Sequence, residues 1–173
     1  INEINQGNGS GPIKVAASIT AHHLSLIVDN WAGNPIKFCK PVAKLPQDRK
    51  ALVAAATSGK PWFFFGSDSA PHPLHAKAVH VGVCAGVYTQ SLAIPYIAQV
   101  FDKEGKLDKL KGFVSDFGKD FYEVSSDDLV NKDHCILLKK EQKVPDVLTQ
   151  GDLQVAPFKA GESLAWSTEW KSV

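Results

Sequence analysis

The chain has 173 residues and a formal net charge of +1, with charges of both signs spread along it. A chain of this length buries a sizeable core and is most simply one domain. The balanced charge argues against a nucleic-acid or membrane-surface partner, and no apolar run is long enough to span a bilayer. We therefore expect a cytoplasmic protein, without a membrane segment, whose partner is a small molecule.

Cysteine and methionine usage gives two further expectations. Cys39, Cys84 and Cys135 are widely separated and form no Cys-x-x-Cys pair. This pattern predicts reduced thiols rather than a disulfide framework or a structural zinc site. The sequence contains no methionine and begins with Ile1, so we expect it to be a piece of a longer polypeptide.

The first hundred residues alternate between strand and helix signals. Residues 15–20 form a short strand-like run, and the Ala-rich segment 46–58 is typical of a helix, with Gly59 as its stop. The run Trp-Phe-Phe-Phe at 62–65 is apolar on both faces, as parallel strands covered by helices are. The alternation predicts an α/β fold with parallel strands.

The remainder predicts helices followed by short strands. Residues 91–101 are apolar nearly all round, which indicates a buried helix bent at Pro95. Apolar residues then recur at helical spacing from 107 to 117, and the pattern predicts that this helix ends at Gly118. From His134 onward, short strands and turns predict a small β-rich C-terminal extension.

The most informative segment is Gly-Ser-Asp-Ser-Ala-Pro-His at 66–72, directly after the apolar run 62–65. It places Asp68 and His72 beyond the end of a buried strand, where α/β enzymes usually carry their chemistry. The same letters are ordinary turn chemistry, in which Asp68 bonds its own backbone and Pro71 fixes a bend. The local pattern leaves both interpretations open.

Two adjacent histidines follow the first predicted strand. If the strand continued through them, His22 and His23 would point to opposite faces and could not serve one metal ion. One of them then lies in a pocket, or is hydrogen-bonded at the strand end.

Two loops are further candidates. Lys40 and Lys44 either bind an anion or are solvated, and the backbone amides of their loop are better suited to hold a polar ligand than either ammonium group. The small residues of 83–87 allow a backbone to approach a ligand closely, or form a tight packing turn.

Five segments in order carry a family resemblance: SITAHHL, FCKPVAK, FFFGSDSAPH, GVCAGVY and APFKAGESLAWS. Together they resemble the dihydroorotases of pyrimidine biosynthesis, in the monofunctional form found in fungi and many bacteria. The resemblance extends from about Ile13 to Trp170. Its most specific part is GSDSAPH followed by CAG.

The resemblance implies the amidohydrolase fold, a (β/α)8 TIM barrel with two zinc ions at the C-terminal ends of its strands. Residues 15–20 and 62–65 then match the seventh and eighth barrel strands, so residues 1–173 are the C-terminal part of a single barrel domain. The first six strands and most zinc ligands, including a carboxylated lysine, are expected upstream. The N-terminal part of the same enzyme is therefore the expected partner, and a homodimer is left open.

The resemblance also implies roles for individual residues. Asp68 ligates one zinc ion and moves a proton from the metal-bridging hydroxide to the departing amide nitrogen. His72 grips the substrate carboxylate, and Ala85 and Lys40 contact the substrate through their main chains. His23 supports the site without binding the metal.

The implied function is the interconversion of dihydroorotate and N-carbamoyl-L-aspartate in de novo UMP synthesis by a zinc-dependent cyclic amidohydrolase. One alternative is a non-catalytic amidohydrolase-like scaffold or binding module. Another is a small α/β module that binds an anionic metabolite without metal. Asp68, His72 and the CAG turn favour the enzyme, because a scaffold has no need of that set.

Overall fold

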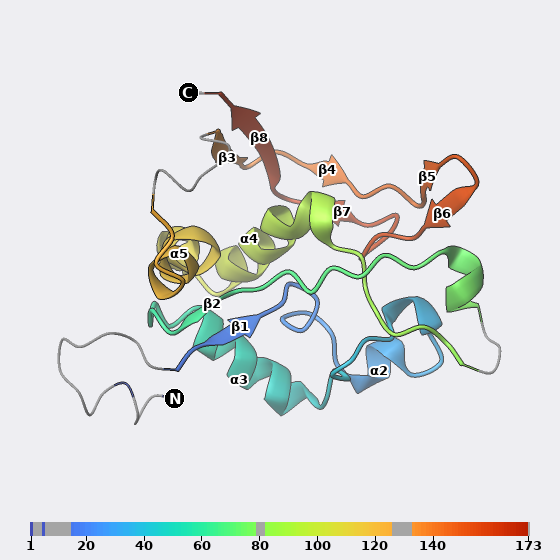
Figure 1. Cartoon of the computed structure of the whole chain (residues 1–173), viewed down its shortest axis with the longest axis horizontal. Coiled ribbons are helices and arrows are strands. Elements are labelled where there is room, and N and C mark those ends of the chain that lie inside the picture. The colour runs from blue at the N-terminus through green and yellow to red at the C-terminus, as the bar shows by residue number, and fades with distance from the viewer. Residues whose placement is uncertain (2–4, 6–14, 79–81, 126–132, 173) are drawn as a thin grey trace.

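The computed structural model describes residues 1, 5, 15–78, 82–125 and 133–172 (Figure 1). The α-helices are α2 (Val28–Trp31), α3 (Pro46–Ala56), α4 (Ala93–Lys103) and α5 (Phe117–Phe121). The strands are β1 (Ala17–Ile19), β2 (Phe63–Phe65), β3 (His134–Leu138), β4 (Gln142–Lys143), β5 (Leu148–Gln150), β6 (Leu153–Val155), β7 (Ser163–Leu164) and β8 (Ser167–Lys171). The order of elements is thus strand, helices and strand, followed by helices and a β-rich end.

The two strands β1 and β2 form the parallel pair that the sequence predicts, with Ser18 opposite Phe64. The connection between them contains α2 and α3, as a parallel pair requires. Directly after β2, Gly66 approaches β1 so closely that a Cβ atom on Gly66 would lie 2.6 Å from the Cβ of Ser18. Only glycine fits this contact, which holds the carboxyl ends of the two strands together.

The core is built around α4, which lies between the β1–β2 pair and the C-terminal strands (Figure 1). Ile97 and Phe101 are fully buried, and the ring of Phe101 packs against that of Phe113 with centroids 5.3 Å apart. The helix begins at Ala93, so Pro95 lies in its first turn rather than in its interior. The N–H groups of the first turn have no acceptor within the helix, so a proline there breaks no helical hydrogen bond. The bend expected at Pro95 therefore lacks a physical reason.

The second helical segment continues further than the sequence predicts. Gly118 lies inside α5, which ends at Phe121. A Cβ atom on Gly118 would lie 3.4 Å from the Phe64 ring. The prediction that Gly118 ends the helix is therefore wrong: this glycine lies within the helix, at a position that faces Phe64 of β2.

The β-rich end consists of three antiparallel pairs, β3–β8, β4–β7 and β5–β6. It is tied to the core by a backbone bridge between Tyr88 and Pro157 and by the Tyr96 hydroxyl, which donates to the carbonyl of Phe158. The described residues therefore combine helices and strands, in agreement with the predicted α/β class.

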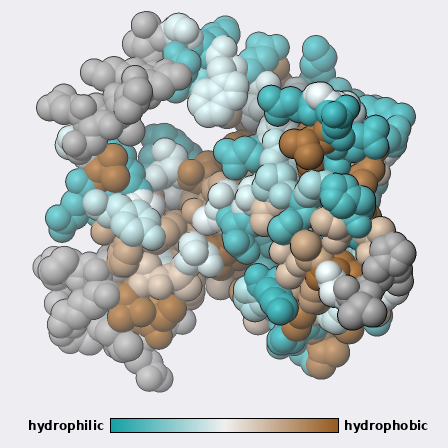
Figure 2. Space-filling model, turned by 45° about the vertical axis from the view of Figure 1, so that its right-hand side comes forward, coloured by the Kyte–Doolittle hydropathy of each residue, from teal (hydrophilic) through white to brown (hydrophobic). Residues whose placement is uncertain are grey.

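The surface carries no single large apolar face in the view of Figure 2, where hydrophobic residues gather in several separate patches. Two exposed aromatic side chains are Tyr122 after α5 and Trp170 in β8, each 67% exposed. Within the described part of the chain, no helix combines the length and the apolar character needed to cross a membrane.

Candidate active site

The turn after β2 presents Asp68 at the carboxyl end of the parallel pair. The side chain of Asp68 is exposed, and its φ of 38° lies in the left-handed region. The next residue holds the turn, because the Ser69 hydroxyl accepts hydrogen bonds from the backbone N–H groups of Thr89 (2.9 Å) and Gln90 (3.0 Å). Ser69 thus accepts the hydrogen bonds that hold this turn. The Asp68 carboxylate stays exposed.

His72 and Ala85, 13 positions apart, are joined by a hydrogen bond. Nε2 of His72 donates to the carbonyl of Ala85 at 3.0 Å, because a carbonyl oxygen can only accept. Gly86 makes this approach possible: it has a φ of 152°, and a Cβ atom there would lie 2.8 Å from Nε2 of His72. The structure therefore brings together two of the residues predicted to bind substrate.

Lys40 lies in the neighbouring loop. Its side chain is exposed, whereas the preceding Cys39 is 1% exposed. The N–H of Gly86 donates to the carbonyl of Phe38 at 2.9 Å. The loop that carries Lys40 is thus anchored beside the segment that carries Ala85.

His23 links that loop to the end of β1 through its two ring nitrogens. Nε2 donates to the carbonyl of Pro41, and Nδ1 therefore accepts from the hydroxyl of Thr20, each at 2.7 Å. The two bonds fix the tautomer of the ring and connect the end of β1 to the residue after Lys40. His23 lies where it can position the loop.

His22 corrects a premise of the sequence analysis. Both histidines lie in the turn 21–25 rather than in a strand, and their ring centroids are 4.5 Å apart. His22 is fully buried, and neither ring nitrogen has a hydrogen-bond partner among the described residues. Burial, with a smaller contribution from His23, lowers the pKa of His22 to about 3, so the ring is neutral.

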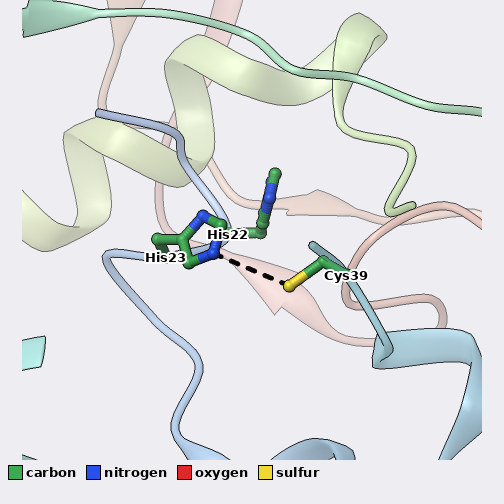
Figure 3. A group of neighbouring side chains, drawn as sticks. All are labelled: His22, His23 and Cys39. Carbon is green, nitrogen blue, oxygen red and sulfur yellow. Dashed lines mark hydrogen bonds between the residues drawn. The ribbon is translucent and has the colours of Figure 1, made fainter. Parts of the chain in front are cut away.

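The two histidines and Cys39 form the only group of three potential metal ligands in the described part of the chain (Figure 3). Their ligand atoms lie within 4.8 Å of one another. Both nitrogens of His23 are already engaged, and burial raises the pKa of the Cys39 thiol, which opposes the thiolate that binds metal. As arranged, this group does not fit a metal ion.

Asp68 is a suitable oxygen ligand for zinc, but it belongs to no group of three potential ligands among the described residues. Zinc in proteins takes at least three protein ligands. The chain therefore offers one ligand at this position, and a complete zinc site needs donors from elsewhere.

Lys77 is a residue at this site that the sequence analysis missed. It is 4% exposed, and its ammonium group lies among backbone carbonyls of the two loops that carry Lys40 and Ala85. No sequence motif marks it.

No protein-family model matches the chain. Curated relatives include a dihydroorotase of Saccharomyces cerevisiae, 63% identical over 160 residues that make up 92% of this chain and 44% of that protein. A probable dihydroorotase of Schizosaccharomyces pombe is 49% identical over 91% of this chain and 45% of its own length. The chain thus spans less than half the length of these relatives.

Solved structures give the same result. A crystal structure of dihydroorotase from Saccharomyces cerevisiae, in complex with 5-fluoroorotic acid, matches all of this chain and 48% of its own, with a TM-score of 0.96 and 60% identity. A dihydroorotase from Campylobacter jejuni matches 96% of this chain and 47% of its own, with a TM-score of 0.78 and 34% identity. The partial coverage is consistent with the predicted C-terminal part. The chain belongs to the dihydroorotase family.

Proposed function

We propose that this chain supplies part of the active site of a zinc-dependent dihydroorotase, which interconverts dihydroorotate and N-carbamoyl-L-aspartate in pyrimidine biosynthesis. The observation that carries the proposal is that the segment after β2 holds both the exposed Asp68 and His72, which is hydrogen-bonded to Ala85, in a chain 63% identical to a named dihydroorotase. The 5-fluoroorotic acid bound by the yeast relative supports a carboxylated pyrimidine ring as the ligand class.

The proposed organisation places β1 and β2 as the seventh and eighth strands of a barrel whose remainder lies outside residues 1–173. That remainder would supply the other zinc ligands, including a carboxylated lysine, and complete a site for two zinc ions. Zinc, when bound, supplies hydroxide near neutral pH and polarises the carbonyl under attack. Asp68 is the ligand that this chain contributes. We also predict that the complete enzyme is cytoplasmic, and a homodimer is left open.

Asp68 would also move the proton. Its carboxylate takes a proton from the attacking water and delivers it to the ring nitrogen as the amide C–N bond breaks. Ring closure reverses these steps, with the proton returned from nitrogen. The exposed position of the carboxylate supports this role, because a proton carrier must reach both the water and the departing nitrogen.

The substrate would be held by the neighbouring groups. His72 lies in the same segment as Asp68, and its Nδ1 can meet the substrate carboxylate, because Nε2 is bonded to Ala85. The backbones of Lys40 and Ala85 supply polar groups without a titrating side chain. The exposed Lys40 ammonium has no assigned role. This division separates binding from proton transfer.

The proposal is tested by Asp68→Asn in the complete polypeptide, meaning this chain together with the remainder that its relatives possess. We expect kcat for ring opening of dihydroorotate to fall by about 10²–10⁴-fold, the usual contribution of a positioned acid–base group. Asp29→Asn is the matched control, because Asp29 is exposed in the first turn of α2, and it should leave kcat unchanged.

Zinc content is measured in parallel, because Asp68→Asn also alters a ligand. An Asp68→Asn enzyme that keeps full kcat would overturn the assigned role of Asp68. A polypeptide that binds no zinc and opens no ring would favour the non-catalytic scaffold instead.

A further inference from the structure

Lys77 ends the helical turn 74–77 with its charge turned inward. Its Nζ donates to three backbone carbonyls: Phe38 at 3.0 Å, Cys84 at 3.0 Å and Gly86 at 2.8 Å. An ammonium group has three N–H donors, so each donor has its acceptor.

This arrangement is costly for a purely structural contact. Lysine is almost never fully buried without a partner charge, and no carboxylate of the described residues forms an ion pair with Lys77. Burial lowers the pKa of Lys77, so the surroundings disfavour the cation. The carbonyl oxygens alone compensate for the loss of water.

The three acceptors belong to the two backbone segments assigned to substrate. Phe38 lies two residues before Lys40, and Cys84 and Gly86 flank Ala85. The carbonyls of Cys84 and Gly86 both turn toward Lys77, whereas the carbonyl between them, on Ala85, accepts from His72. The ammonium thereby fixes the direction of the peptide groups on both sides of Ala85.

We propose that Lys77 is a positioning residue for substrate binding: its ammonium locks segments 38–40 and 84–86 together, and so orients the main-chain groups of Lys40 and Ala85 toward the substrate. The inference rests on the proposed function. Lys77 does not touch the substrate and takes no part in proton transfer.

The test is Lys77→Met in the complete polypeptide, because methionine keeps a linear side chain and removes all three donors. The contacts at stake hold substrate and transition state alike, and losing such contacts raises KM with kcat unchanged. We expect KM for dihydroorotate to rise about tenfold or more, with kcat within about threefold of the wild type. Lys50→Met is the control, because Lys50 is exposed on α3, and its KM should not change.

Lys77→Gln is the second variant, in case Lys77→Met does not fold. Its neutral amide keeps two donors, so its KM should lie between those of the wild type and Lys77→Met. If the wild type is active and the folded Lys77 variants have the same KM as the wild type, the inference is overturned, even if the melting temperatures of the variants are lower. A wild type that opens no ring with zinc added would overturn the proposed function itself, and with it this role for Lys77.

Discussion

His22 and His23 are adjacent, yet burial and hydrogen bonding separate their behaviour. His23 gives one ring nitrogen to Thr20 and the other to Pro41. His22 is enclosed completely, with no described partner for either nitrogen. A buried imidazole without an acceptor resists protonation, so His22 contributes a pH-dependent term to stability.

The sign of that term follows from the pKa of His22, about 3 in the folded protein against an ordinary 6.5. Between these values the unfolded chain binds a proton that the folded protein does not, so stability rises with pH. Below pH 6.5, we expect His22 to lower the free energy of unfolding by about 1.4 kcal/mol per pH unit. Urea unfolding between about pH 7 and about pH 5 should show a shallower pH dependence for His22→Gln than for the wild type. Parallel curves would refute the assignment.

At the scale of elements, the site depends on how closely β1 and β2 end together. Residues 17–19 and 63–65 pair in parallel, so the turns after them meet at one edge. Gly66 makes the closest approach, with its backbone against the side chain of Ser18. Any side chain at position 66 separates the strand ends and shifts Asp68, two residues later.

Gly66→Ala tests this packing. Its Cβ would lie 2.6 Å from that of Ser18, and overpacking of this kind costs about 1–3 kcal/mol. We expect urea unfolding to show a loss of that size. Ser18→Gly removes the opposing Cβ, so the double variant should lose less than the sum of the two single variants. Strictly additive losses would show that the contact does not govern stability.

The elements were largely predictable, and the exceptions have physical causes. The apolar run 62–65 followed by the turn segment 66–72 identifies both the strand and the position of Asp68. His22 and His23 are expected at the end of a strand but lie in the turn 21–25, because local propensity does not report tertiary packing. Gly118 resembles a helix stop, but it is a contact point with β2.

The candidate site was predictable where side chains carry the signal and not where the backbone does. Asp68 and His72 stand out because titratable groups follow a strand made of apolar residues. Lys77 does not, because lysines are mostly exposed and its three acceptors are carbonyl groups, which every residue possesses. Cys84 and Gly86 contact Lys77 only through their main-chain carbonyls, so their residue types give no sign of this contact.

For the whole molecule, the decisive feature of the proposed function is that this chain supplies a single zinc ligand, Asp68. The β1–β2 pair is a two-stranded sheet among the described residues, so each strand has an unpaired edge there. Such an edge is a ready surface for another strand. The relatives are more than twice as long as the matched part, which supports a barrel completed by residues outside this chain.

The most direct test compares ring opening of dihydroorotate, with zinc added, by the complete polypeptide and by residues 1–173 alone. We predict activity for the complete polypeptide and none for the isolated chain, because Asp68 alone cannot hold zinc. An active isolated chain would place the missing ligands within these 173 residues and contradict the composite site. A complete polypeptide that binds zinc but leaves the ring intact would contradict the proposed function.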